Sequence, residues 1–334
     1  MNRLGELVIK RRSFLTGVGG ALATGLGAKH LCDWNEWSLR APVFVAKASS
    51  YEVDLETIIK NGLMELGQSP AWVKGKAVLL KPNLVEASDR APHINTHPAV
   101  VRAVAEVFRS WGAGSVVVAE GPGHCSDTQL VLDESGLGPT LRESNLEFVD
   151  LNHDDVVFVS NRLRQTALAQ LALPATLKHA DLIVSLPKMK THHWVGVTLS
   201  LKNLFGVMPG IVYGWPKNVL HFAGIGPSIL DIAAAVRPHL AIVDGIIAME
   251  GDGPIMGTAK HAGVLVMGTN LPAVDATCVR IMGLNPWRVG YLVGASGRLG
   301  PVSERHIDQR GEPIASVASR FEILNHPSLA ILRS

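Results

Sequence analysis

The chain has 334 residues, enough for one large domain or two medium-sized domains with substantial cores. Of these residues 47% are hydrophobic and the formal net charge is only +2, which excludes a disordered chain and provides no overall basic field for nucleic acid. The three cysteines, Cys32, Cys125 and Cys278, are too far apart for a zinc knuckle or a four-cysteine iron–sulfur motif, so we expect no iron–sulfur cluster in this chain.

The first 40 residues have the pattern of an export signal. Arg11 and Arg12 precede an apolar stretch, residues 15–28, which is shorter than the roughly 20 residues that span a bilayer. A charged segment followed by a short apolar one is typical of a targeting signal, and the paired arginines indicate the twin-arginine type. The alternative, a basic amphipathic helix, is disfavoured by several glycines that each cost about 1 kcal/mol. We therefore expect export by the twin-arginine machinery to an extracytoplasmic space such as the periplasm, with the signal either cleaved or retained as an anchor.

From residue 41 onward, short apolar runs alternate with amphipathic stretches. The runs are rich in β-branched residues, as expected of strands covered on both faces, and comprise residues 43–45, 78–80, 116–119, 182–185, 240–243 and 264–267. The clearest helix begins at Pro98 and ends near Trp111, before Gly112. This alternation predicts an α/β fold with two lobes of mainly parallel βαβ units, Rossmann-like, over residues 41–238 and 239–334.

Polar residues follow most of these runs, and ligands of open parallel sheets bind at the carboxyl ends of the strands. The candidate site residues are Lys81, Asn83, His97, Glu120, His124, Lys188, Lys190, His192, Lys202, Asn203, His221, Glu250, Asp252 and Asp275. Lysines gathered with histidines favour an anionic ligand, and histidine also serves as a metal ligand or in acid–base catalysis.

Each candidate also has a simpler structural interpretation. Lysines such as Lys81 could lie on the solvated surface, the segment 250–254 could be a plain turn, and Asp275 could only bond a neighbouring backbone group. Because adjacent residues of a strand point to opposite faces, we expect His192, and not His193 as well, to reach the ligand.

Four segments, in this order, resemble the domain-of-unknown-function 362 family. They are residues 78–84 (VLLKPNL), 186–192 (LPKMKTH), 202–206 (KNLFG), and Asp244-Gly245 with residues 250–254 (EGDGP). The resemblance covers about residues 42–283. Some members of that family carry a ferredoxin module, so the resemblance implies an oxidoreductase role that would here need a separate iron–sulfur partner.

A more distant resemblance is to lactate racemase-like proteins. In those proteins a histidine lies ten residues before the lysine that tethers a nickel-pincer nucleotide, and a nickel-binding histidine lies eleven residues after a Pro-Gly pair. Here His192 precedes Lys202 by ten residues and His221 follows Gly210 by eleven. The resemblance implies that Lys202 is the tether and that His221 is the metal ligand. It also implies that His97, His124 and His192 are the proton-transfer or hydride-stabilising groups around the substrate.

We therefore expect an exported enzyme of racemase, epimerase or redox type that acts on a small anionic substrate, with a metal or a lysine-tethered nucleotide as cofactor. Two alternatives remain open. The chain could be an exported accessory protein that binds a metal or an anion without catalysis, or an oxidoreductase component that works with an iron–sulfur protein.

Overall fold

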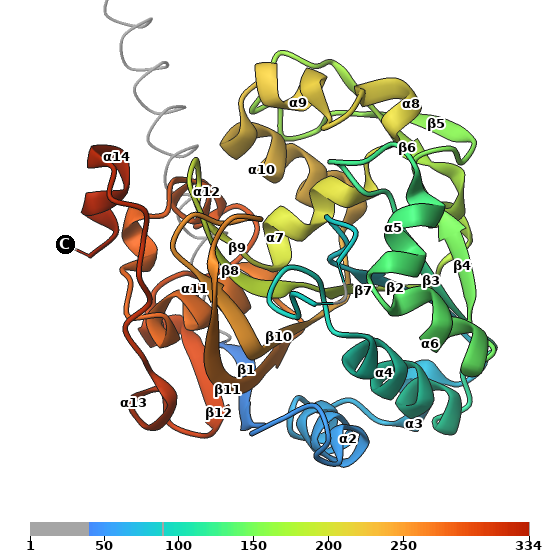
Figure 1. Ribbon diagram of the computed structural model, residues 1–334, viewed down its shortest axis with the longest axis horizontal. Helices are drawn as coiled ribbons and strands as arrows, with labels where there is room; N and C mark the ends of the chain where they lie inside the picture. Colours follow the sequence, from blue (N-terminus) through green and yellow to red (C-terminus); the bar gives the residue numbers. More distant parts are fainter. Residues whose placement is uncertain (1–39, 89, 334) are drawn as a thin grey trace, which may run out of the picture. The chain divides into compact units, whose positions relative to one another are not determined.

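A computed structural model describes residues 40–88 and 90–333, which are built around one large β-sheet (Figure 1). Arg11, Arg12 and the rest of the predicted export signal lie outside the described residues. Within the described part of the chain, no helix combines the length and the apolar character that a membrane crossing requires.

The large sheet is mainly parallel, as the sequence predicts. From one edge to the other its strands are β12 (Ile307–Gly311), β1 (Ala41–Lys47), β11 (Thr258–Gly268), β10 (Leu240–Glu250), β7 (Leu182–Leu186), β2 (Ala77–Pro82), β3 (Ser115–Glu120) and β4 (Glu147–Asp150). Only β11 runs antiparallel to its neighbours in this order. Each predicted strand lies within one of these strands, so the α/β class is confirmed.

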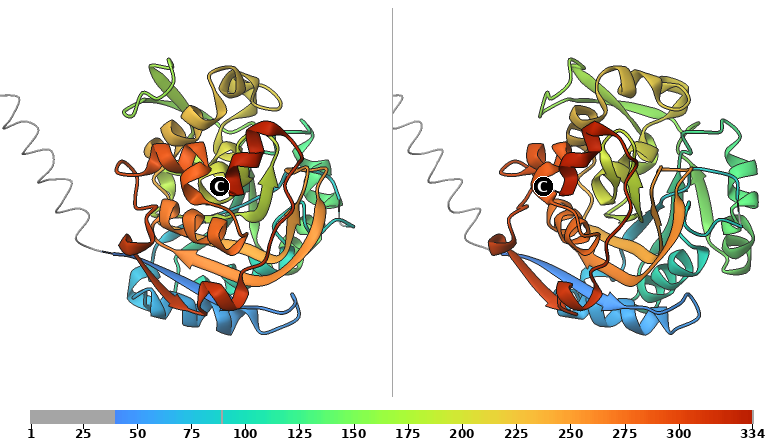
Figure 2. Two further views of the ribbon diagram at one scale, coloured as in Figure 1. Left: turned by 90° about the vertical axis from the view of Figure 1, so that its left-hand side faces the viewer. Right: turned by 60° about the vertical axis from the view of Figure 1, so that its left-hand side comes forward.

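Three shorter features extend the sheet or stand beside it. Strand β8 (Lys188–His192) pairs with β10, and β9 (Gly196–Thr198) pairs with β8. Strands β5 (Val156–Ser160) and β6 (Gln170–Pro174) form a separate two-stranded sheet. In Figure 2 this hairpin projects from the body of the protein, and the red strand β12 lies along the blue strand β1.

Helices cover both faces of the large sheet because successive side chains of each strand point to opposite faces. Val78 and Leu80 belong to one apolar cluster, whereas Leu79 between them belongs to the other. The helices are α2 (Leu55–Glu65), α3 (Pro70–Val73), α4 (Pro98–Ser110), α5 (Thr128–Glu134), α6 (Leu137–Glu143), α7 (Ser200–Asn203), α8 (Gly210–Tyr213), α9 (Asn218–Phe222), α10 (Ile225–Val236), α11 (Leu271–Ile281), α12 (Gly290–Ala295), α13 (Ile314–Val317) and α14 (Pro327–Ala330). In Figure 1, α2 and α4 lie below the strands, and α7 and α10 lie above them.

Helix α4 has the limits that the sequence predicts. Pro98 is its first residue, His97 caps it by accepting a hydrogen bond from the Ala99 N–H at Nδ1 (3.2 Å), and Trp111 is its C-cap. Gly112 then has φ +82°, a conformation that residues with a Cβ rarely adopt. The helix ends here because the backbone turns into the left-handed region.

The sheet continues across the predicted division near residue 238. Helix α10 ends at Val236, and β10 then pairs with β7 from the first part and with β11 from the second. The division into two lobes stays a prediction.

Candidate functional site

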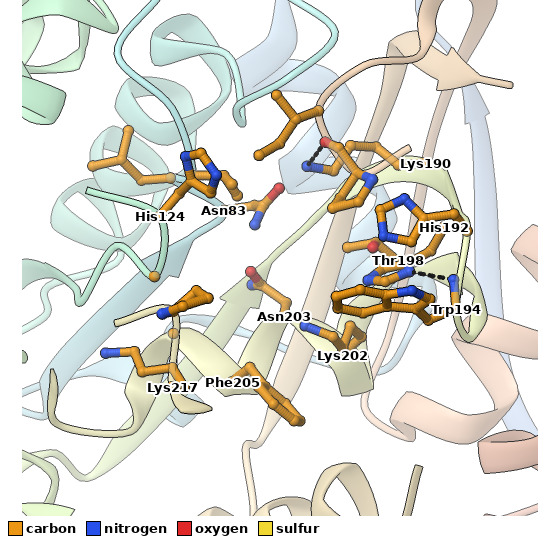
Figure 3. A pocket seen from close by; sticks show the side chains of 18 of the residues that line it. Asn83, His124, Lys190, His192, Trp194, Thr198, Lys202, Asn203, Phe205 and Lys217 are labelled. Carbon is orange, nitrogen blue, oxygen red and sulfur yellow. Dashed lines mark hydrogen bonds between the residues drawn. The ribbon is translucent and has the colours of Figure 1, made fainter. Parts of the chain in front are cut away.

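A cavity of about 400 Å³ lies where β2 and β3 end, a size typical of small-molecule sites. The predicted site residues that line it are Lys81, Asn83, Glu120, His124, Lys190, His192, Lys202, Asn203, His221 and Asp252. Figure 3 shows several of these side chains arranged around the hollow. Residues from segments far apart in the sequence therefore meet in one place, because parallel strands end at the same edge of the sheet.

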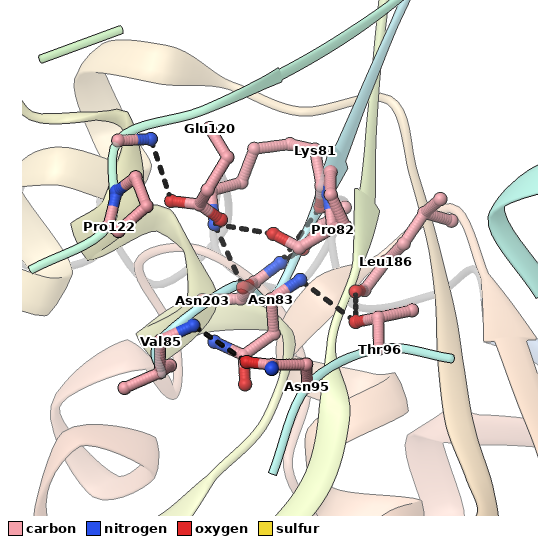
Figure 4. A network of polar contacts seen from close by, with 12 residues as sticks. Lys81, Pro82, Asn83, Val85, Asn95, Thr96, Glu120, Pro122, Leu186 and Asn203 are labelled. Atoms are coloured by element: carbon pink, nitrogen blue, oxygen red, sulfur yellow. Dashed lines mark hydrogen bonds and ion pairs between the residues drawn. The ribbon is translucent and has the colours of Figure 1, made fainter. Parts of the chain in front are cut away.

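A buried ion pair forms one wall of the cavity (Figure 4). Lys81 of β2 donates to the Glu120 carboxylate at the end of β3, and it also donates to Asn203 Oδ1 (2.9 Å). Burial lowers the pKa of Lys81 and raises that of Glu120, and each charge counters the shift of the other. Gly206 is required beside this pair, because a Cβ there would collide with both Glu120 and Lys81.

Two buried polar atoms of the cavity wall have no hydrogen-bond partner among the described residues. They are Asn83 Oδ1 and Thr198 Oγ1. A buried polar group without a partner costs about 1–3 kcal/mol, so most such groups in folded proteins are satisfied by protein, water or a ligand. These two atoms are therefore suited to contact a bound molecule.

Lys202 is held in the cavity by the short helix α7. Asp275 of α11 caps that helix by accepting hydrogen bonds from the N–H groups of Ser200 (2.8 Å) and Leu201 (3.1 Å). Burial raises the pKa of Asp275 to about 7. Asp275 therefore supports the site from outside the cavity, as its simpler interpretation predicts.

Lys202 is the least buried of the four cavity lysines. Its Nζ lies 4.1 Å from the centre of the Phe205 ring, and burial, followed by the charge of Lys81, lowers its pKa to about 8. An amine with such a pKa is partly neutral near neutral pH and is a competent nucleophile.

Two histidines of the cavity have complementary hydrogen bonding. His192 Nδ1 accepts a hydrogen bond from the Trp194 N–H (3.1 Å), which places the proton of the neutral ring on Nε2. His221 Nδ1 lies 3.0 Å from the Lys217 carbonyl oxygen and must donate to it, which leaves a lone pair on Nε2. Burial lowers the pKa of both rings, that of His192 strongly. The pair therefore offers one donor and one acceptor or metal-ligating nitrogen.

Lys190 and Lys217 add buried positive charge to the cavity. Lys190 is fully buried and donates to the carbonyl oxygens of Ile94 (2.8 Å) and Pro254 (3.2 Å). Lys217 donates to Asn152 Oδ1, and burial lowers its pKa to about 8. Burial lowers the pKa of Lys190 well below its usual range, and the charges of the neighbouring lysines add to the shift.

The cavity consequently carries more positive than negative groups. Lys81 is the only one of its four lysines with an ion-pair partner among the described residues. The other lining carboxylate, Asp252, is half-exposed at the rim and pairs with His193 (3.1 Å). Buried lysines without counter-charges favour an anionic ligand.

Two predicted residues, His97 and Lys188, lie outside the cavity in a second buried cluster. Lys188 pairs with Asp244 (2.6 Å) and bonds the Tyr51 hydroxyl (3.0 Å). His97 stacks on Tyr51 with ring centres 3.6 Å apart, and burial lowers its pKa to about 4. Lys188 does not line the cavity, and the pairing of β8 with β10 is irregular between Lys188 and Lys190.

The remaining predicted residues lie at the edge of the site or away from it. His124 is exposed at the rim, with Nδ1 2.9 Å from Glu86. Glu250 lies outside the cavity, where it pairs with Lys260 (3.2 Å) and accepts from the Glu322 N–H (2.9 Å). No group of three or more His, Cys, Asp or Glu residues within the described ranges is arranged to hold a metal ion.

Several cavity residues have no counterpart in the sequence-based prediction. They are Lys217, Thr198, Trp194 and the segment Pro254–Met256. Lys217 follows a cis peptide bond between Trp215 and Pro216 and has φ +71°, an uncommon conformation for a lysine. A single sequence contains no signal for that backbone geometry.

The fold and the cavity define an α/β protein with a lysine- and histidine-lined cavity at the carboxyl edge of a mainly parallel sheet. The family model described as "Domain of unknown function (DUF362)" matches residues 78–280. The "Thylakoid-associated protein sll1697" of Synechocystis sp. is 31% identical over 265 residues, which are 77% of this chain and 79% of that protein. The chain belongs to the DUF362 family, as its motifs predict.

Two solved structures are also similar to this chain, at low identity. The lactate racemase apoprotein from Thermoanaerobacterium thermosaccharolyticum has a TM-score of 0.46 and 14% identity, over 74% of this chain and 58% of that chain. A protein from Thermotoga maritima has a TM-score of 0.41 and 12% identity, over 70% of this chain and 59% of that chain. This chain thus spans less than two thirds of either structure.

Proposed function

We propose that this protein is an enzyme that binds a small organic anion in the cavity and transfers a proton on it. The observation that carries the proposal is the surplus of buried positive charge: Lys190, Lys202 and Lys217 line the cavity without an ion-pair partner among the described residues. An apo cavity of this kind is unfavourable, and a carboxylate or phosphate supplies the missing charge.

The histidines supply acid–base chemistry next to that anion. His221 Nε2 has a free lone pair and is the base that takes a proton from the carbon beside the carboxylate. The electron pair of the broken C–H bond moves onto the carboxylate oxygens, where the lysine ammonium groups stabilise it. His192 Nε2–H returns a proton to the same carbon as the proton held by His221 passes back to His192 through water, so that both rings end neutral and the net result is a racemase or epimerase reaction.

A second candidate is a cofactor tethered to Lys202, of the nickel-pincer nucleotide type or with another metal. The residues fit such a group, because the Lys202 amine has a lowered pKa and His221 Nε2 lines the same cavity. Lys202 would hold the cofactor and His221 would bind its metal, while Asn83 Oδ1 and Thr198 Oγ1 are free to contact it. When bound, it would supply a soft or borderline Lewis-acidic metal centre beside the substrate.

Two other functions are also compatible with this cavity. A binding protein without catalysis would hold the anion or a metal and never consume it, and an oxidoreductase component would need a separate iron–sulfur partner.

Export by the twin-arginine machinery is part of the proposal and rests on Arg11 and Arg12. The thylakoid association in the relative's name is compatible with a location outside the cytoplasm.

Calorimetric titration with inorganic phosphate and with lactate tests anion binding, and deuterium uptake at lactate C2 in D₂O, followed by NMR, tests proton transfer. We expect Lys190→Met to weaken binding, whereas Lys60→Met, at an exposed lysine of α2, serves as the matched control. Failure of every anion to bind would refute the proposal. Binding without deuterium uptake would favour the binding-protein reading.

Intact mass and elemental analysis of protein from its own host test the tethered cofactor. A mass excess with a stoichiometric metal, lost in Lys202→Ala and kept in Lys60→Ala, is the expected result for that candidate. An unmodified, metal-free chain would contradict it.

A further inference from the structure

The residues that line the cavity range from fully buried lysines to exposed apolar side chains. Lys81 and Lys190 are 0% exposed and Lys217 is 2% exposed, so these positive groups lie deep. Trp194 and Met256 also line the cavity but are 65% and 77% exposed, so they lie at its mouth.

The wall between the two levels is largely apolar. Leu84, Phe205 and Ile255 line the cavity together with Pro216 and Pro254. A volume of about 400 Å³ corresponds to roughly a dozen water molecules at about 30 Å³ each, which is much more than a three-carbon acid fills. A small polar anion held by the lysines would therefore leave the apolar wall in contact with water.

Two of the most exposed apolar side chains of the described residues lie at this mouth. Among the described residues, the four most exposed large apolar side chains are Phe222, Met256, Trp194 and Phe158. Met256 and Trp194 line the cavity, and Phe222 directly follows the cavity residue His221 in α9. Trp194 and Met256 therefore give the cavity an exposed apolar mouth.

We infer that the ligand of this cavity is an amphiphilic anion, with a carboxylate or phosphate at the lysines and a hydrocarbon part of several carbons that extends to Trp194 and Met256. The inference rests on the proposed anion site and names its substrate class. The ligand is a dissolved molecule and not a bilayer surface, because only these two cavity-lining side chains are strongly exposed and apolar, which is a small area for membrane attachment.

The test is a calorimetric titration with inorganic phosphate, butyl phosphate and decyl phosphate, each below its micellar concentration, and with acetate, butanoate and decanoate to compare the two head groups. We expect the dissociation constant to fall by about fourfold for each methylene that the wall buries, until the chain reaches the mouth. Inorganic phosphate should displace decyl phosphate, because the two share the lysines.

The mouth is tested with Met256→Ser, and Met64→Ser is the matched control because Met64 is an exposed methionine of α2. The readout is the ratio of the phosphate to the decyl phosphate dissociation constants. We expect Met256→Ser to reduce this ratio several-fold and Met64→Ser to leave it at the parent value, with both variants folded by circular dichroism.

The outcomes separate this inference from the proposed function. If phosphate binds with the same affinity as decyl phosphate, the inference fails and the anion site stands. If no anion binds at all, the proposed function fails and the inference fails with it. Cosedimentation with phosphatidylcholine vesicles that Met256→Ser abolishes would assign the mouth to a bilayer and overturn the inference.

Discussion

Lys188 and Lys190 provide a paired test of how charge is distributed in this protein. They lie two residues apart on β8 and both are 0% exposed. Lys188 has a buried carboxylate partner, Asp244 (2.6 Å), whereas Lys190 donates only to the carbonyl oxygens of Ile94 and Pro254. The same substitution, lysine to methionine, should therefore lower the free energy of unfolding at Lys188 and the affinity for the anion at Lys190.

The magnitudes follow from what each substitution leaves behind. Lys188→Met leaves the Asp244 carboxylate buried without a counter-ion, which costs about 3–5 kcal/mol. The Tyr51 hydroxyl and the His97 N–H, each 3.0 Å from Asp244, still donate to it, so we expect about 3 kcal/mol. Lys190→Met loses two hydrogen bonds of about 1 kcal/mol each but removes a desolvated amine, so its net effect should lie within about 1 kcal/mol of zero.

Urea unfolding followed by circular dichroism measures the free energy of unfolding, and titration with inorganic phosphate measures ligand affinity. Lys190→Met should retain stability and lose about 10- to 100-fold in affinity, the equivalent of one charged hydrogen bond of about 1.5–3 kcal/mol. Lys188→Met should lose stability and change the affinity of the folded molecules less. If Lys190→Met destabilises as much as Lys188→Met, the reasoning that Lys190 lacks compensation is refuted.

Three further predictions concern the groups around the cavity. Asp275→Asn should lower the free energy of unfolding by about 1–3 kcal/mol in urea, because an amide oxygen cannot accept at both carboxylate positions that cap α7; an unchanged stability would contradict the capping role. Burial lowers the pKa of His97 from 6.5 to about 4, so the folded state binds fewer protons than the unfolded state and stability is lost as the pH falls through this range; His97→Phe should flatten the dependence in urea titrations, and an equal slope would count against it. The acylation rate of Lys202, followed by peptide mass spectrometry, should rise with pH and level off near its pKa of about 8, whereas a free lysine side chain in a model peptide levels off near about 10.4; a profile for Lys202 that matches the model peptide would contradict the lowered pKa.

The sheet could be predicted from sequence because its strands are buried on both faces. Runs such as 78–80 and 182–185 are mainly apolar without alternation, which is the pattern of a covered parallel strand. The convergence of the site followed from the same topology, since Lys81 and Glu120 end neighbouring parallel strands. The apolar composition of the short runs was therefore enough to predict the strands of the sheet.

Other parts of the site could not be predicted, because they depend on backbone geometry and packing. Lys217 reaches the cavity through a left-handed backbone conformation, and Thr198 lies on a short strand that is defined only by its pairing with β8. Conversely, Lys188 shares the period-2 pattern of Lys190 and His192 but pairs with Asp244 on the neighbouring strand β10 instead. The period-2 rule identifies the side chains that share one face of a strand, but it does not identify the residues that they contact.

The capping of α7 by Asp275 also determines when the site can form during synthesis. The helix that carries Lys202 lies in the middle of the chain, but its cap is made 73 residues later (275 − 202 = 73), and β1 pairs only with β11 and β12. A ribosome-bound chain that has exposed residues 41–238 therefore holds all four cavity lysines but lacks Asp275, which caps the helix of Lys202, and Pro254, which accepts a hydrogen bond from Lys190. Any molecule that is to be enclosed in the cavity must arrive after nearly the whole chain has been made.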